Sequence, residues 1–161
     1  MKIGIKALYR SSGHSYKGRF GKGSLPYEVE SCEAFDLVAG SGIVGDRYFD
    51  HKPDFKGQIT FFDWAVYEEV MKEFTLPDLD PRAFRRNAMI SGVDLNALIG
   101  KRFVLNGVEY SGSEEAAPCF WMNEACAEGV HEFLMGKGGL RCRIHNNGIL
   151  PLGEGELKIL D

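Results

Sequence analysis

Residues 103–110 read FVLNGVEY, and this octapeptide predicts a β-hairpin. Its central Asn106-Gly107 pair suits the positive φ angles of a type I′ turn, whose twist matches that of two antiparallel strands. Residues 103–105 and 108–110 would then form the paired strands. Strand pairing is therefore expected to organise this fold.

Short strands are also predicted on both sides of the hairpin. The 161 residues include 20 glycines and 11 phenylalanines, a mixture that favours tight turns and short apolar strands over a helical bundle. Further strands are expected at residues 3–8, 28–37, 57–62 and 140–145, and a long loop at residues 11–24. Because domains usually hold about 100–200 residues, we expect a single, mainly β (α+β) domain over residues 1–161.

Two helices are predicted beside the strands. Asp63 can cap a helix with apolar residues at four-residue spacing as far as Phe74, and Pro77 forbids its continuation. Residues 121–135 predict a second helix, because Gly129 is the one residue among them with a low helical propensity. The first helix is expected to be structural, and the second would begin just after Cys119.

Charge and hydrophobicity exclude several classes of partner. The formal net charge of −4 provides no global positive field for a polyanion, so a nucleic acid partner is not expected. No run of about 18 apolar residues could span a membrane, and the first ten residues have no secretory h-region. We therefore expect a soluble cytoplasmic protein with no membrane partner, in which any anion site is local.

The four cysteines differ in their surroundings. No CxxC pair occurs and reduced thiols are expected. Cys119 follows a proline at the predicted start of a helix, where the helix dipole favours a thiolate that could act as nucleophile or metal ligand. A small buried hydrophobe is the alternative. Cys126 and Cys142 are interpreted as packing residues and Cys32 as structural. Zinc is not expected, because strand alternation sends Cys142 and His145 to opposite faces.

Residues 140–145 alternate between apolar and basic side chains. Arg141 and Arg143 fall on one strand face with His145, and Leu140, Cys142 and Ile144 fall on the other. Two guanidinium groups on one face could hold phosphate or pterin oxygens by paired contacts, although a solvated strand face would look the same. We expect both arginines to line a pocket shared with Cys119.

Two further basic segments could each be either a ligand-binding site or a solvated surface turn. Arg85-Arg86-Asn87 places two guanidinium groups beside an amide, which suits an anionic heterocycle but is also typical of a solvated turn. Asp46-Arg47 could be a surface ion pair, or its carboxylate could accept ring N–H donors. No GxSxG, Walker-type, HExxH or GxGxxG pattern supports a hydrolase, NTPase, metalloprotease or dinucleotide-binding function.

Four ordered blocks together resemble the MOSC family, the molybdenum cofactor sulfurase C-terminal domain. The resemblance spans roughly residues 42–155, and its specificity lies in the order of the blocks, since each is common alone. The blocks are Gly45-Asp46-Arg47; Arg85-Arg86-Asn87 with Gly92-Val93-Asp94-Leu95 and Leu98-Ile99-Gly100; Pro118-Cys119; and Gly138-Gly139-Leu140-Arg141-Cys142-Arg143.

The resemblance implies a β-barrel-like domain with peripheral helices and a site for the molybdenum cofactor, molybdopterin. It implies that Cys119 either ligates the metal or carries sulfur as a persulfide. The implied cofactor-binding residues are Asp46, Arg47, Arg85, Arg86, Asn87, Gly138, Gly139, Arg141 and Arg143.

The sequence departs from the family pattern at three places. Ala116-Ala117 replaces an acidic residue that often precedes the Pro-Cys pair, and Gly153-Glu154 stands where Gly-Asp is usual. Tyr48 occupies the place of a frequent histidine, so His51 or His14 would have to supply a proton there.

Three functions are compatible with these residues, and none requires pyridoxal phosphate. The first is a molybdenum-dependent reductase of N-hydroxylated substrates such as hydroxylamino purines, with Cys119 as metal ligand and a separate electron donor. The second is sulfur transfer, in which Cys119 takes a persulfide from a cysteine desulfurase. The third is a non-catalytic molybdopterin carrier.

Overall fold

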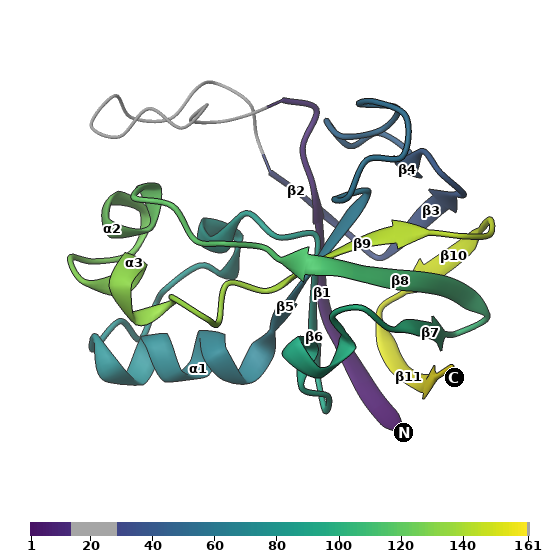
Figure 1. Ribbon diagram of the computed structural model, residues 1–161. Helices are drawn as coiled ribbons and strands as arrows, with labels where there is room; N and C mark the ends of the chain where they lie inside the picture. Colours follow the sequence, from purple (N-terminus) through teal and green to yellow (C-terminus); the bar gives the residue numbers. More distant parts are fainter. Residues whose placement is uncertain (14–28, 161) are drawn as a thin grey trace.

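A seven-stranded mixed β-barrel forms the centre of the computed structural model, which describes residues 1–13 and 29–160 (Figure 1). Most of the expected 11–24 loop, the start of the 28–37 strand and His14 lie outside the described residues. The barrel strands run around the ring in the order β11, β7, β8, β9, β5, β6 and β1, and β1 pairs again with β11. Their bounds are β1 Lys2–Arg10, β5 Ile59–Asp63, β6 Ala88–Ser91, β7 Arg102–Leu105, β8 Val108–Glu115, β9 Leu140–Ile144 and β11 Gly153–Ile159.

Antiparallel pairing dominates the ring, and β5 and β6 make a parallel pair. The predicted hairpin is confirmed as β7 and β8, with Leu105 opposite Val108 and positive φ angles of 51° at Asn106 and 82° at Gly107. The strands expected at 3–8, 57–62 and 140–145 correspond to β1, β5 and β9. The mainly β, barrel-like fold class is therefore confirmed.

The single strand expected at 28–37 is wrong, because the chain changes sheets at Glu33. β2 (Glu30–Cys32) pairs with β1 of the barrel, whereas β3 (Ala34–Val38) joins a separate sheet with β10 (Gly148–Pro151) and β4 (Gly42–Ile43). The carbonyl of Glu33 accepts a hydrogen bond from Leu152 N, 2.9 Å away. That bond attaches the chain to its new partner at the point where it leaves the barrel.

The helices lie together on one side of the barrel (Figure 1). α1 (Trp64–Glu73) is confirmed, with the Asp63 carboxylate accepting from Ala65 N at 2.9 Å. The single helix expected at 121–135 is wrong: α2 (Trp121–Ala125) and α3 (Val130–Phe133) replace it. Gly129 separates them in a left-handed conformation with φ of 95°, which breaks the helical hydrogen-bond series.

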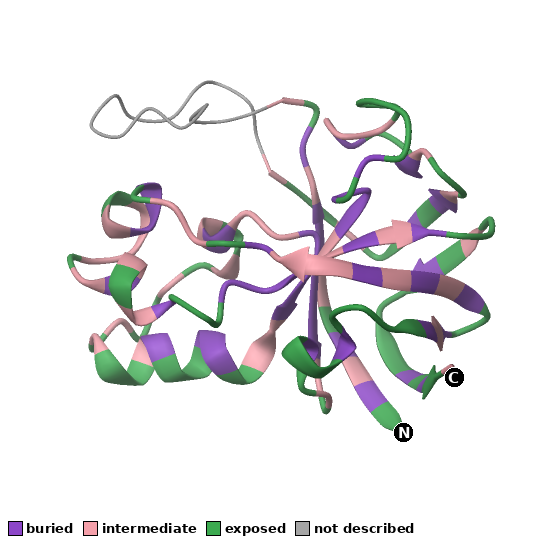
Figure 2. Cartoon of the chain, viewed as in Figure 1, coloured by how far each residue is buried: buried purple, intermediate pink, exposed green. Residues whose placement is uncertain are grey.

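Two 3-10 helices, η1 (Pro81–Phe84) and η2 (Leu95–Leu98), complete the described helical elements, and none of the helices there is long and apolar enough to cross a membrane. Apolar side chains form one core inside the barrel and a second core between the barrel and the helices. Figure 2 shows the resulting alternation of buried and less buried positions along the strands. In β9, Leu140, Cys142 and Ile144 are buried and the two arginines are not, as predicted.

The barrel core contains a hydroxyl group with no hydrogen-bond partner among the described residues. Tyr110 is fully buried, with its ring stacked on Phe103 at 5.3 Å and edge-on to Phe61 at 5.5 Å. Burial raises the pKa of Tyr110, so its hydroxyl stays protonated. The ring contributes packing, whereas the buried hydroxyl loses its hydration without compensation.

We expect Tyr110→Phe to raise the free energy of unfolding by about 1 kcal/mol, because it removes an unsatisfied polar atom and keeps the ring. Urea denaturation of the two proteins measures the difference. Tyr110→Leu serves as the control and should lower stability through lost aromatic packing. A Phe variant less stable than the parent would show that a buried water satisfies the hydroxyl.

Candidate functional site

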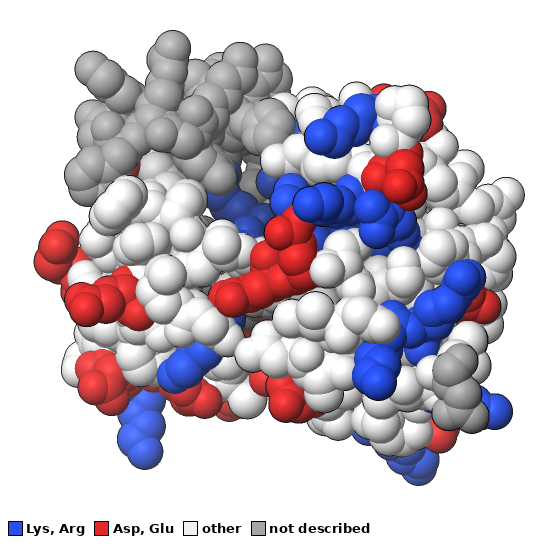
Figure 3. Space-filling model, viewed as in Figure 1, with Lys and Arg blue, Asp and Glu red and all other residues white. Residues whose placement is uncertain are grey.

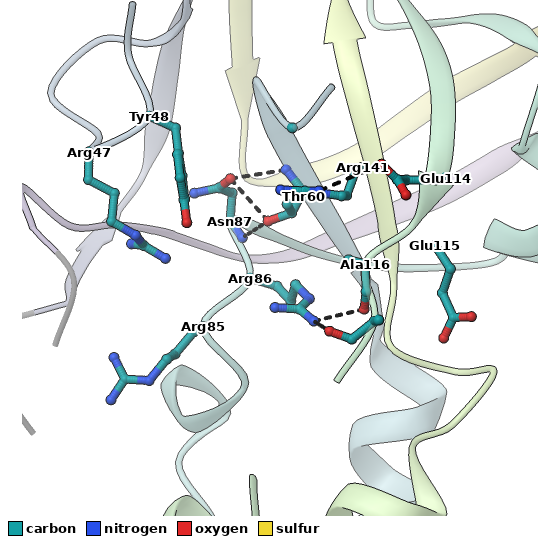
Figure 4. A pocket seen from close by; sticks show the side chains of 12 residues that line it. Arg47, Tyr48, Thr60, Arg85, Arg86, Asn87, Glu114, Glu115, Ala116 and Arg141 are labelled. Carbon is teal, nitrogen blue, oxygen red and sulfur yellow. Dashed lines mark hydrogen bonds and ion pairs between the residues drawn. The ribbon is translucent and has the colours of Figure 1, made fainter. Parts of the chain in front are cut away.

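A cavity of about 270 Å³ opens where β5, β8 and β9 meet the loops that follow β4 and η1. Figure 4 shows the labelled side chains that line it, which come from these separate segments. Its lining residues are Arg47, Tyr48, Gly57, Thr60, Arg85, Arg86, Asn87, Glu114, Glu115, Ala116, Ala117 and Arg141.

The cavity is locally cationic. Four arginines and two glutamates give its lining a formal charge of 4 − 2 = +2, in a chain whose total is −4. Figure 3 shows Lys and Arg side chains gathered around a hollow on this face, with acidic side chains beside them. A local anion site in an acidic protein was the expectation from the sequence, and the electrostatics of the cavity fit it.

The side-chain amide of Asn87 forms hydrogen bonds with other groups of the protein. Its Oδ1 accepts hydrogen bonds from Thr60 N at 3.0 Å and Thr60 Oγ1 at 3.1 Å, and its Nδ2 donates to Tyr9 O at 3.1 Å. These bonds join β1, β5 and the loop before β6 at the cavity floor (Figure 4). Asn87 therefore builds the cavity, with its amide already engaged on both sides.

Asp46 has a similar supporting position and does not line the cavity. Its buried carboxylate accepts from Ser11 N at 3.1 Å and Tyr48 N at 3.3 Å, and it lies 4.0 Å from Arg47 Nη1. The oxygens that could have accepted ring N–H donors are thus occupied by the backbone. Asp46 instead fixes the turn that carries Arg47 into the cavity.

Arg86 fastens the cavity wall. Its Nε donates to Gly138 O at 2.8 Å, and its Nη2 donates to Ala116 O at 2.8 Å and Ala117 O at 3.3 Å. Arg85 has a left-handed backbone with φ of 56° and points away from Arg86, with its guanidinium 4.6 Å from the Trp121 ring (Figure 4). The two neighbouring arginines therefore contact different parts of the protein: Arg86 binds the segments at Ala116 and Gly138, and Arg85 lies over Trp121.

Gly138 and Gly139 allow two backbone segments to approach closely. A Cβ on Gly138 would lie 2.1 Å from Ala116 O, and one on Gly139 would lie 2.4 Å from Phe61 O. Gly139 also has a φ of +109°, which L side chains rarely adopt. These glycines are absent from the cavity lining, and their contacts assign them to the packing that supports Arg86.

Arg141 and Arg143 line one cavity together, and Arg141 also lines a second one. Arg141 lines the cavity, lies 3.7 Å from Glu114, and passes so close to Gly57 that a Cβ there would be 2.9 Å from its Nε. Arg143 pairs with Asp54 at 2.9 Å and lines a neighbouring cavity. Both arginines therefore line the neighbouring cavity, and Arg141 connects it to the first one.

Cys119 lies next to the cavity and does not line it. It is half-buried against the helical core, two residues after Ala117 of the cavity wall, and its carbonyl accepts from Met122 N at the start of α2. Its expected position at a helix start is confirmed, and it is absent from the described linings of the two cavities that contain Arg141.

The other cysteines have the packing environments that were expected of Cys126 and Cys142. Burial raises the pKa of Cys126 to about 11, and Cys142, in the barrel core, has its pKa raised by complete burial. Cys32 is half-buried, and burial raises its pKa as well. Among the described residues no three His, Cys, Asp or Glu side chains group so as to hold a metal ion.

The acidic side of the cavity was not expected from the sequence. Glu114 and Glu115 both belong to the cavity lining because β8 has an irregular register against β9 between Gly112 and Glu114. Glu115 Oε2 accepts from Gly138 N at 3.1 Å. The adjacent glutamates were the only local signal, and the register shift that directs them inward has no sequence motif of its own.

Comparison with known proteins gives one family and several similar structures. The MOSC domain family matches residues 46–154. The YuaD protein of Bacillus subtilis has 20% identity and a TM-score of 0.76 over 99% of this chain and 96% of its own. YiiM of Escherichia coli has 16% identity and a TM-score of 0.68 over 100% and 70%, and YiiM of Geobacillus stearothermophilus has 13% and 0.69 over 99% and 75%. No curated protein matches the sequence.

We expect Arg86→Lys to lower the free energy of unfolding by about 2 kcal/mol, because one ammonium cannot replace a planar fork that reaches several carbonyls. Thermal and urea unfolding measure the loss. Arg141→Lys is the matched control and should cost less than about 1 kcal/mol, since its Glu114 partner is exposed. If both variants lost the same free energy of unfolding, the hydrogen bonds of Arg86 would not be what stabilises the cavity wall.

Cys126 should be slow to alkylate at pH 8, because a thiol with a pKa of about 11 is about 0.1% thiolate there. Its rate should rise about tenfold per pH unit up to pH 10. The measurement is iodoacetamide labelling read by peptide mass spectrometry. Rapid labelling of Cys126 at pH 7 in folded protein would contradict the burial.

Proposed function

The chain belongs to the MOSC domain family, and on the strength of that membership and its arginine-lined cavity we propose that it binds the molybdenum cofactor and reduces N-hydroxylated substrates. Membership implies a redox role related to the molybdenum cofactor. The observation that carries the proposal is the presence of four arginines in the lining of one cavity in an acidic protein.

The residues of the cavity fit an anionic pterin. Arg47 Nε is buried without a hydrogen-bond partner among the described residues, although its guanidinium group lines the cavity. Such a donor costs free energy unless a ligand satisfies it, and a phosphate or pterin oxygen is a suitable acceptor. Arg85 and Arg141 would add further charge from the opposite sides of the cavity, while Arg86, Asn87 and Asp46 hold the walls in place.

The metal would arrive with its pterin, since the described residues offer no cluster of protein ligands. Cys119 is the side chain that we propose as its protein ligand, because it follows the cavity wall by two residues and is partly accessible. A soft thiolate ligand suits such a metal. The residues that would hold the cofactor are thus the cavity arginines and, two residues beyond Ala117, the Cys119 thiol.

The proposed reaction consumes two electrons and two protons, converting R–NHOH to R–NH2 and water. The bound cofactor supplies a metal centre that transfers the two electrons, which come from a separate donor protein. The chain's own residues would position the cofactor and exclude water, and the two protons would come from solvent at the open side of the cavity. Tyr48 lines the same cavity and orders its rim through its contact with Arg47.

A cofactor carrier is the second candidate function, and one observation favours it. No cysteine lines the arginine cavity, so the chain could bind the pterin without a thiolate at the metal. A carrier would retain molybdenum and show no turnover. Sulfur transfer is the third candidate and requires a persulfide on Cys119 without bound metal.

We expect Cys119→Ser to lower cofactor-dependent reduction by at least about 100-fold, because serine is a harder and far less acidic ligand. Turnover of an N-hydroxylated base is measured on cofactor-reconstituted protein with a chemical electron donor. Molybdenum content and the melting temperature are measured on the same samples, and both should stay near those of the parent.

Cys126→Ser is the matched control, since Cys126 is a packing residue of the same region. It should keep full turnover. Equal turnover by the Cys119 variant would exclude this thiol from the reaction. Bound molybdenum without turnover in the parent would identify the carrier, and a persulfide on Cys119 detected by mass spectrometry would identify sulfur transfer.

A further inference from the structure

A second cavity of about 490 Å³ adjoins the arginine-lined one. The two cavities share Arg141 and Glu114, so the Arg141–Glu114 ion pair stands between them. The second cavity is lined by Lys52, Pro53, Asp54, Phe55, Lys56, Glu114, Arg141 and Arg143.

This second cavity is also cationic. Four basic and two acidic side chains give it a formal charge of 4 − 2 = +2. Arg143 is paired with Asp54 at 2.9 Å and Lys56 with Glu114 at 3.4 Å. Lys52 has no carboxylate within ion-pair distance among the described residues, and its ammonium lies 5.5 Å from the centre of the Phe55 ring. The lysine thus carries an uncompensated charge at the cavity.

An ordered aromatic wall connects the two cavities. Phe55 is buried, stacks on Tyr48 at 5.3 Å and lies 4.7 Å from the His51 ring. Tyr48 lines the first cavity and Phe55 lines the second. The Arg141 guanidinium lies 5.4 Å from the Phe55 ring. A ligand that extended from one cavity to the other would follow this wall past Arg141.

We propose that the second cavity binds a phosphate monoester on the substrate, whose N-hydroxylated part occupies the first cavity beside the cofactor. This inference rests on the proposed function. A phosphate monoester carries nearly two negative charges near pH 7 and three acceptor oxygens, which match a formal charge of +2, the Arg141 and Arg143 forks and the Lys52 ammonium. The reacting group and the phosphate would be held on opposite sides of the Arg141–Glu114 pair.

The test compares adenosine 5′-monophosphate with adenosine, as probes that bind without reacting. Isothermal titration is carried out on cofactor-free and cofactor-loaded protein. We expect the monophosphate to bind at least about tenfold more tightly in both forms. Lys52→Glu should reduce that preference about tenfold by reversing one nearby charge. Lys72→Glu, an exposed lysine on α1 outside both cavities, is the matched control and should keep the preference.

Each other outcome overturns the inference. Equal binding of the two probes, or an unchanged preference in Lys52→Glu, removes the phosphate subsite. A preference that disappears on cofactor loading assigns the cavity to the cofactor. Inorganic phosphate binding as tightly as the monophosphate assigns it to the free ion. Turnover of an unphosphorylated base would still support the proposed function, so the two failures are distinguishable.

Discussion

Closure of the ring by the β1–β11 pairing is the constraint on which the rest of the structure depends. Lys2 to Ile5 pair with Gly153 to Glu156, while β1 also pairs with β6 on its other side. Closure leaves no open edge in the barrel and fixes the strands relative to one another. The cavity residues on β5, β8 and β9 can converge because the ring brings those strands together, although they are up to about eighty positions apart in sequence.

The local features of this fold could be predicted from sequence, whereas the assembly of the site could not. The Asn106-Gly107 turn, the Asp63 cap and the alternation along β9 each depend on a few neighbouring residues, and each is found. The break between α2 and α3 occurs at Gly129, whose left-handed conformation a single glycine in a helix-forming segment did not predict. The register shift that brings Glu114 and Glu115 to the cavity is likewise a property of paired strands.

The motif residues divide into those that face the cavity and those that make it. Arg47, Arg85 and Arg141 line the cavity with positive charge. The Asp46 carboxylate binds backbone N–H groups, and Gly138 and Gly139 allow close backbone approaches. Sequence patterns treat both groups alike, because a residue that supports a binding wall is as restricted as one that touches a ligand. Side-chain hydrogen bonds and close backbone approaches separate them.

The bonds from Arg86 to the carbonyls of Gly138 and Ala116 have a consequence for local motion. They tie the segment after β8 to the segment before β9, and Ala116 N also donates to Gly139 O at 2.9 Å. Opening this wall would break several bonds at once, so amide protons there should exchange with solvent mainly during cooperative unfolding. The 50–56 segment is held by the Lys56–Glu114 and Arg143–Asp54 ion pairs at its surface and by the buried Phe55 ring. The cavity wall bonded by Arg86 would thus stay in place under conditions that leave the rest of the fold intact.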